Sequence, residues 1–176
     1  MSGKQNSSYI EKKQRFSERK MAKVIEQYLR KRGYTTVCEL VLNNRYFDIK
    51  EITGKELTKV RIDVAAHKNG NITFIEIENG LWLTHPLLYR ELAHRLFLAF
   101  PKGYTSPVDK EQLQFAAAFG IGIVAVQKTG ELELLAEPTN HPIPEKRARV
   151  IINLINKRAR QKKEGNQSPP VISSFK

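Results

Sequence analysis

The Asn69-Gly70 pair constrains the fold of this chain more than any other feature of the sequence. It lies between two stretches in which apolar and polar residues alternate. Asn-Gly in that setting is the strongest short-range signal for a β-hairpin with a two-residue type I′ turn, because both turn residues take a positive φ. This turn sets the register of the two strands, and the register places Asp63 opposite Glu76.

The same register assigns the other hairpin side chains to faces, because neighbours along a strand point in opposite directions. Arg61 is expected to face Glu78. One face is expected to carry the charged residues and one aromatic ring: Arg61, Asp63, Phe74, Glu76 and Glu78. The other face is expected to lie against the core: Ile62, Val64, Ile75 and Ile77.

Two directly opposed acids are an unusual choice for a strand pair. Their Cβ atoms lie about 4.5–5.5 Å apart, where like charges are destabilising, and such a pair favours a shared proton or a cation. Mg²⁺ often uses only one or two protein carboxylates together with water and phosphate. The hairpin therefore predicts a metal site at Asp63 and Glu76. Two simpler arrangements are alternatives: one acid points to solvent past the sheet edge, or Glu78 is only the ion-pair partner of Arg61.

Periodicity and punctuation predict the remaining elements. Helices are expected over residues 17–32, from residue 84 or 85, from residue 106 to the glycine at 120, and over residues 145–163. Strands are expected at residues 36–42, 46–52, 59–67, 72–78, 96–100, 121–126 and 131–135. The order α-β-β-β-α-β-α-β plus a C-terminal helix is that of an α/β domain with a mixed sheet flanked by helices. Residues 17–163 are expected to form a single domain between two disordered tails, a basic one at 1–16 and one at 164–176.

The net charge of +12 is concentrated in two segments. Residues 1–32 hold ten basic and three acidic side chains, a net charge of +7, and residues 145–163 hold eight and one, again +7. Basic segments of this kind attract the phosphates of nucleic acid through counterion release. The candidate phosphate contacts are Lys157, Arg158 and Arg160 in the second segment, and Lys68 and Arg90 outside both segments. An anionic membrane surface and solubility alone are the alternative explanations.

Several classes of protein are disfavoured by composition. The single cysteine, Cys38, rules out an internal disulfide and a multi-cysteine zinc site. No apolar run approaches the roughly 18 residues that span a bilayer, and residues 1–20 lack the apolar region of a secretory signal. We therefore expect a cytoplasmic (intracellular) protein with no membrane partner.

A helix followed by strands that carry Asp63, Glu76 and Glu78 resembles the PD-(D/E)xK nuclease superfamily, which has the restriction-endonuclease-like fold. The stretch from Gln112 to Gly120 and the apolar strand after it are similar to the archaeal Holliday junction resolvases. The resemblance implies a nuclease that depends on Mg²⁺ or Mn²⁺, with DNA as the expected substrate, including branched or end structures. It implies that Asp63, Glu76 and the carbonyl of Ile77 bind the metal, while Glu78 orients or deprotonates the attacking water.

The chain departs from the family pattern at three places. Ile62 stands where the motif has proline, and Glu78 stands where the triplet has lysine. The third departure is on the first helix, where the resolvases carry a glutamate about three turns before the closing glycine and this chain has Met21. Glu18 and Glu26 are the candidates to take its place. The missing lysine supports a second hypothesis, a catalytically degenerate nuclease fold that acts as a nucleic-acid-binding or assembly module. RNA as substrate, endonuclease or exonuclease action and a homodimer are open alternatives.

Overall fold

The predicted hairpin forms with the predicted register. The computed structural model describes residues 17–80, 83–102 and 110–165. Within it, strand β2 (Lys59–Lys68) and strand β3 (Asn71–Ile77) pair antiparallel from Lys68–Asn71 to Val64–Ile75. Asn69 and Gly70 have φ values of 50° and 81°, as a type I′ turn requires. The regular pairing ends at Val64 and Ile75, so Asp63 and Glu76 occupy the next position, where the two strands begin to separate.

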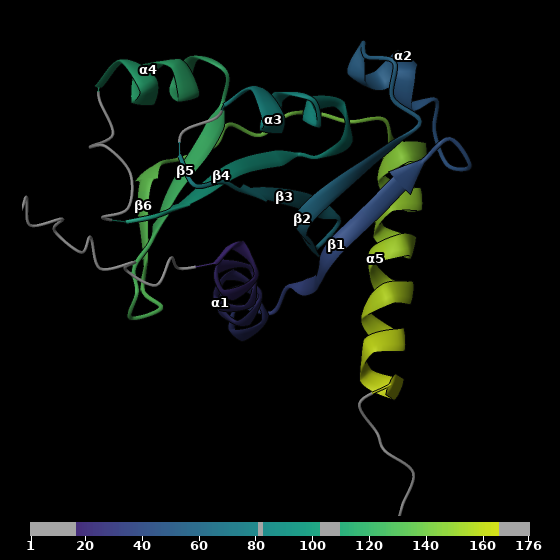
Figure 1. Cartoon of the computed structure of the whole chain (residues 1–176). Helices are drawn as coiled ribbons and strands as arrows, with labels where there is room; N and C mark the ends of the chain where they lie inside the picture. Colours follow the sequence, from purple (N-terminus) through teal and green to yellow (C-terminus); the bar gives the residue numbers. More distant parts are fainter. Residues whose placement is uncertain (1–16, 81–82, 103–109, 166–176) are drawn as a thin grey trace, which may run out of the picture.

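The hairpin is the centre of an open six-stranded mixed sheet with the strand order β1-β2-β3-β4-β5-β6 (Figure 1). Strands β1 (Thr35–Asn43), β2 and β3 form an antiparallel meander. Strands β4 (Arg95–Pro101) and β5 (Ile121–Val126) then add parallel to β3, and β6 (Leu132–Ala136) adds antiparallel to β5. The expected mixed sheet flanked by helices is confirmed.

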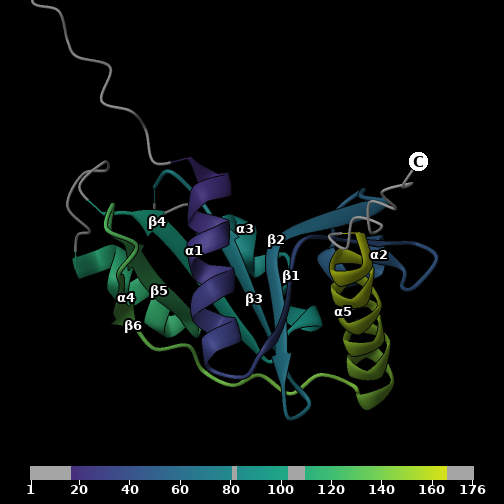
Figure 2. The same ribbon diagram turned by 90° about the horizontal axis from the view of Figure 1, so that it is seen from below.

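Helices cover both faces of the sheet. Helix α1 (Glu18–Lys31) packs Met21, Ile25 and Leu29 on one face, against Val64, Ile75 and Ile77. Helix α5 (Glu145–Gly165) packs Ile151 and Ile155 on the other face, against Ile62 and Phe74. Helix α3 (Thr84–Leu87), the 3-10 turn Arg90–Leu92 and helix α4 (Lys110–Ala118) share the α5 side. Figure 2 shows α1 and α5 on either side of β1 and β2.

The expectation of a single core face on the hairpin is wrong. Phe74, placed on the charged face, is fully buried, because α5 and the segment after α3 cover that face. Ile62 packs in the α5 cluster and Val64 in the α1 cluster, although they are two residues apart. On β1, Cys38 pairs with Val64 and Leu40 pairs with Ile62. Glu39, between Cys38 and Leu40, has a φ of 55° and interrupts this pairing. This irregularity lets the strands turn side chains from one face to the other.

Two predicted elements also differ. The stretch 46–52 is not a strand but leads into helix α2 (Ile49–Thr53), because Asp48 caps its start by accepting from Glu51 N and Gly54 ends it in the left-handed conformation. The predicted second helix is reduced to the four residues of α3. The start of the predicted third helix and the expected tail at 1–16 lie outside the described residues. Of the tail expected at 164–176, residues 164 and 165 belong to α5, which ends at Gly165, and the rest lies outside the described residues. Among the described helices, none is long and apolar enough to cross a membrane.

Glu26 ties the two main helices together. Its carboxylate accepts from Arg30 Nη2 at 2.9 Å within α1, and from Lys162 Nζ of α5 at 3.0 Å on both oxygens. The residue is only 6% exposed. Burial and, to a smaller extent, the negative charge of Glu26 raise the pKa of the neighbouring Cys38 thiol to about 11. Cys38 is therefore an unreactive strand residue. Glu26 therefore has a structural role in the fold.

Replacing Glu26 by alanine is expected to lower the free energy of unfolding by about 1–3 kcal/mol, because two cations lose their shared buried carboxylate. For a chain of this size the melting temperature should fall by roughly 2–10 °C, as followed by circular dichroism. The matched control is Glu145→Ala, which removes the exposed pair with Arg149 and should cost less than about 0.5 kcal/mol. Equal losses in the two variants would contradict the role given to Glu26.

Candidate active site

The acids of the predicted hairpin site line one cavity of about 310 Å³ at the end of β2 and β3. Four acids, two cations, an imidazole and a phenol contribute to its wall: Glu18, Asp63, Glu76, Glu78, Lys59, Arg61, His85 and Tyr89. We call this space the carboxylate cavity. The structure therefore brings together Asp63, Glu76 and Glu78, as the register predicted, and adds Glu18 from the first turn of α1.

Asp63 takes the place of a missing backbone partner. Beyond the last regular pair, β3 continues beside β4, where Ile77 pairs with Ala99. The Ile77 N–H instead donates to Asp63 Oδ2 at 2.9 Å. This bond holds the Asp63 carboxylate at the point where the strands separate. Arg61 Nη2 lies 3.8 Å from Asp63 Oδ1 and is largely exposed, so it supplies only a weak ion pair.

Glu76 is the most perturbed acid in the cavity. It is 5% exposed, and its Oε1 has no hydrogen-bond partner among the described residues. Burial and then the negative charge of Asp63 raise the pKa of Glu76 to about 9. Burial also raises the pKa of Asp63, although the Ile77 N–H acts in the opposite direction. The pair therefore favours a proton or a cation between its oxygens.

Glu78 is held by a histidine. Its Oε1 lies 2.5 Å from His85 Nδ1 of α3, whereas the ion pair of Arg61 is with Asp63. The alternative in which Glu78 serves only Arg61 therefore does not describe this structure. Sequence reasoning gave His85 no role, because its one local signal was a position before a proline. Only the turn of the chain after β3 brings it to the cavity.

The donor set fits a hard divalent cation. Two carboxylates, of Asp63 and Glu76, and the carbonyl of Ile77 are oxygen ligands of the kind that Mg²⁺ and Mn²⁺ prefer. The unpartnered Glu76 oxygen and the raised pKa values of both acids fit a positive charge at this point. In the described part of the chain, no group of three His, Cys, Asp or Glu side chains is placed to hold a metal. Any ion here would therefore take part of its coordination from water or substrate.

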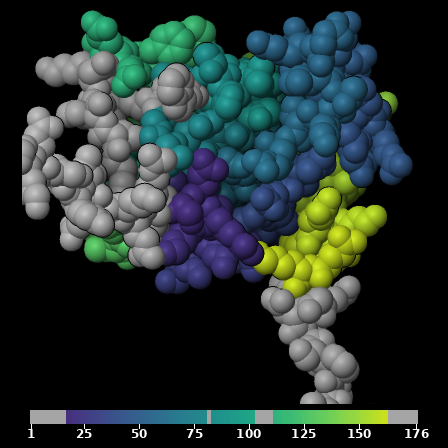
Figure 3. All heavy atoms as spheres, in the orientation of Figure 1, coloured from purple at the N-terminus to yellow at the C-terminus, as the bar shows by residue number. Residues whose placement is uncertain are grey.

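A larger hollow of about 840 Å³ adjoins the carboxylate cavity and runs between α1 and α5. The two spaces share Glu18, Arg61, Asp63 and Ile77. Cations from both helices line it, Arg19, Lys23, Arg158 and Lys162, together with the acids Glu18, Glu26, Glu39 and Asp63. We call it the basic groove; Figure 3 shows α1 in purple and α5 in yellow on the same side of the molecule. Of the cations predicted on the last helix, Arg158 lines this groove, while Lys157 and Arg160 are exposed on the same helix.

The other predicted residues lie elsewhere or have other partners. Lys68 Nζ donates to the carbonyl of Arg32 at 2.6 Å, which suits a cation at the C-terminal end of α1. Arg90 donates to Thr139 Oγ1 at 3.3 Å, and burial lowers its pKa. Neither lines the carboxylate cavity or the basic groove. Glu18 lines both and accepts from Asn79 Nδ2 at 3.3 Å, whereas Glu26 lies in the groove wall bound to its two cations.

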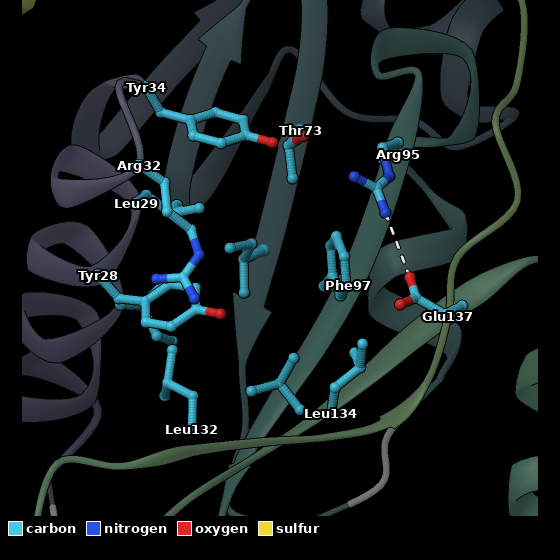
Figure 4. Close-up of a pocket in the computed structure, with 13 residues that line it drawn as sticks. Tyr28, Leu29, Arg32, Tyr34, Thr73, Arg95, Phe97, Leu132, Leu134 and Glu137 are labelled. Atoms are coloured by element: carbon cyan, nitrogen blue, oxygen red, sulfur yellow. Dashed lines mark hydrogen bonds and ion pairs between the residues drawn. The ribbon is translucent and has the colours of Figure 1, made fainter.

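A third hollow of about 240 Å³ lies on the α1 side of the sheet, between α1 and β6 (Figure 4). Its lining includes Phe97, and its two arginines contact neighbouring side chains. The Arg32 guanidinium stacks 3.7 Å from the centre of the Tyr28 ring, and Arg95 pairs with Glu137 at 3.3 Å. None of the residues predicted from the sequence to bind or react lies here.

The comparisons with known proteins establish a fold and no activity. No protein-family model and no curated protein matches the chain. Among solved structures, it is similar to SPO1766, a protein of unknown function from Silicibacter pomeroyi, with 18% identity over 89% of this chain and 94% of that one and a TM-score of 0.56. A protein of unknown function, AF1548, aligns with 12% identity over 60% of this chain and 57% of that one, with a TM-score of 0.42. The chain therefore shares its overall fold with SPO1766.

Glu76→Gln is expected to stabilise the metal-free protein at alkaline pH. Between the unfolded pKa of 4.5 and the folded pKa of about 9, the folded state holds the extra proton, so wild-type stability falls as the pH rises through this window. The variant lacks this dependence, and at pH 8.5 it should exceed the wild type by at least about 1 kcal/mol, or 2–4 °C. Melting temperatures from pH 5 to 9 in chelator measure the gap. Parallel curves for the two proteins would show that Glu76 is not perturbed.

Proposed function

We propose that the protein is a Mg²⁺- or Mn²⁺-dependent nuclease that hydrolyses phosphodiester bonds, with DNA as the substrate. The observation that carries the proposal is the Asp63–Glu76 pair, with one buried oxygen unpartnered among the described residues, at the end of a groove lined by cations. Fold alone does not define activity, so the proposal rests on this site. The PD-(D/E)xK resemblance of the hairpin adds the same expectation.

Each residue of the site has a stated part in the proposal. Asp63, Glu76 and the Ile77 carbonyl would hold the cation, which when bound polarises the phosphodiester and acidifies a coordinated water. Glu78, which the resemblance places near the attacking water, would act beside the bound cation. Arg158, Lys162 and the cations of α1 would bind the backbone in the basic groove, without reading sequence.

The second candidate is a nucleic-acid-binding or assembly module that has the fold without the chemistry. Glu78 in place of the usual lysine favours it, as does the lack of a three-ligand metal group among the described residues. Both candidates predict binding in the basic groove. Only the nuclease predicts that the Asp63–Glu76 pair changes the covalent state of the substrate.

Glu76→Gln should abolish cleavage without loss of DNA binding, because it removes the charge that faces the cation and leaves the groove intact. The measurement uses labelled linear, flapped and four-way DNAs with Mn²⁺ and, in parallel, with chelator. Glu145→Gln, an exposed acid at the start of α5, is the control and should cleave like wild type. A wild type that binds these DNAs and cuts none of them with Mn²⁺ would favour the binding module.

DNA binding should weaken steeply with salt, because each phosphate contact contributes a slope of about 0.9 in log K against log salt. The triple replacement of Lys157, Arg158 and Arg160 by alanine should weaken binding to all sequences alike and reduce the slope by about 1–3. Fluorescence anisotropy at several salt concentrations measures both quantities. The control replaces Arg45, Lys50 and Lys55, exposed cations outside the groove. Equal effects of the two triple variants would remove α5 from the interface.

A further inference from the structure

His85 lines the carboxylate cavity. It comes from α3, and its Nδ1 is 2.5 Å from Glu78 Oε1. Both side chains line the cavity together with Asp63 and Glu76. The His85 side chain is 58% exposed and the Glu78 side chain is 20% exposed, so the imidazole is the more accessible of the two to a molecule from solvent.

The contact with Glu78 selects one tautomer of the imidazole. A carboxylate accepts only from a protonated ring nitrogen, so Nδ1 carries the hydrogen and the neutral ring presents a lone pair at Nε2. No hydrogen bond to Nε2 is formed by the residues that the structure describes. That nitrogen is therefore left for a molecule in the cavity.

The other polar groups of the cavity have a partner, a proposed role as cation ligand, or a positive charge that prevents them from accepting a proton. Asp63 and Glu76 are the proposed cation ligands. The Tyr89 hydroxyl is nearly buried and donates to the Arg61 carbonyl at 3.3 Å, and burial raises its pKa. Lys59 and Arg61 are cations, and Glu18 accepts from Asn79. Among the described residues of the cavity, His85 Nε2 is the exposed acceptor closest in kind to a general base.

We propose that His85 is a catalytic residue that accepts a proton from the attacking water, and that Glu78 positions it. This inference rests on the proposed nuclease function. The water oxygen forms a bond to phosphorus while the bond from phosphorus to the leaving sugar oxygen breaks. The water proton passes to Nε2, and the leaving oxygen takes a proton from solvent. The imidazolium then releases its proton to solvent, which returns the pair to its starting state.

Single-turnover cleavage with saturating Mn²⁺ tests the assignment. His85→Ala should slow cleavage by about 100-fold or more, the usual contribution of a general base, with unchanged affinity for DNA and for Mn²⁺ by calorimetry. Added imidazole should restore part of the rate in a saturable manner. Glu78→Ala should cost about 10-fold, and the double variant should be no slower than His85→Ala alone, because Glu78 acts through His85.

A second readout does not need activity. Nitrogen-15 spectra of the metal-free protein should show His85 protonated at Nδ1, and Glu78→Ala should abolish this preference. For the cleavage assay the matched control is His141→Ala, because His141 Nε2 also lies near a carboxylate, 3.5 Å from Glu91 Oε1, but outside the cavity. The His141→Ala variant should cleave at the wild-type rate.

The outcomes separate the two proposals. If wild type cleaves and His85→Ala cleaves within threefold of it, His85 is not the base and the nuclease proposal stands. A slow His85→Ala that imidazole does not rescue, or that loses Mn²⁺ affinity, also overturns the assignment. If wild type cuts no substrate while retaining the Nδ1-protonated tautomer, the nuclease function itself fails and the catalytic role of His85 fails with it.

Discussion

The site depends on a buried acid that has no protein partner for one of its oxygens within the described structure. Glu76 lies at the point where β3 leaves β2 and continues beside β4, with little water to screen its charge. An ionised carboxylate in such a place is costly unless a proton or a cation compensates it. The two cations in the described wall of the cavity, Lys59 and Arg61, are both exposed to solvent, so they compensate this charge only weakly. The geometry thus leaves a positive charge to be supplied from outside.

The separation of β2 and β3 creates this position. If β2 and β3 continued to pair regularly, Asp63 and Glu76 would form an ordinary cross-strand pair on a sheet surface that helices cover. Instead, the Ile77 N–H bonds to the Asp63 side chain, so the carboxylate compensates for the lost strand partner and turns toward the cavity. The parallel pairing of β3 with β4 then carries Glu78 toward α3, where His85 meets it. A change of strand partner therefore assembles acids and imidazole in one space.

The charges of the molecule are arranged around this centre in layers. Acids from β2, β3 and α1 outnumber cations in the wall of the inner cavity, whereas the groove that opens into it has cations from α1 and α5 interspersed with acids. The buried Glu26 carboxylate accepts from Arg30 of α1 and Lys162 of α5, and this shared contact holds the two basic helices together. A polyanion drawn to the groove would be led toward the acids, whose repulsion for phosphate is relieved only by a bound cation.

Local signals predicted most elements and the central pairing of the site. The Asn69-Gly70 turn has one favourable geometry, so the register that joins Asp63 to Glu76 could be read directly, and the first helix was correctly predicted over residues 17–32. The same local reasoning failed for residues 46–52, where the capping residues Asp48 and Gly54 outweighed a strand-like composition. It also failed for Phe74 and Ile62, because alternation along a strand does not say that both faces are covered.

The sequence by itself determined the hairpin, its register and the proximity of two acids, because a two-residue turn leaves the chain almost no freedom over these few residues. Only the tertiary structure decided that Glu76 is buried, that Glu78 pairs with His85 rather than Arg61, and that Glu18 joins the cavity while Glu26 joins two helices. Those outcomes depend on which helix covers which face and on where β3 exchanges partners. Such long-range packing is set by the whole core, so no local pattern of residues contains it.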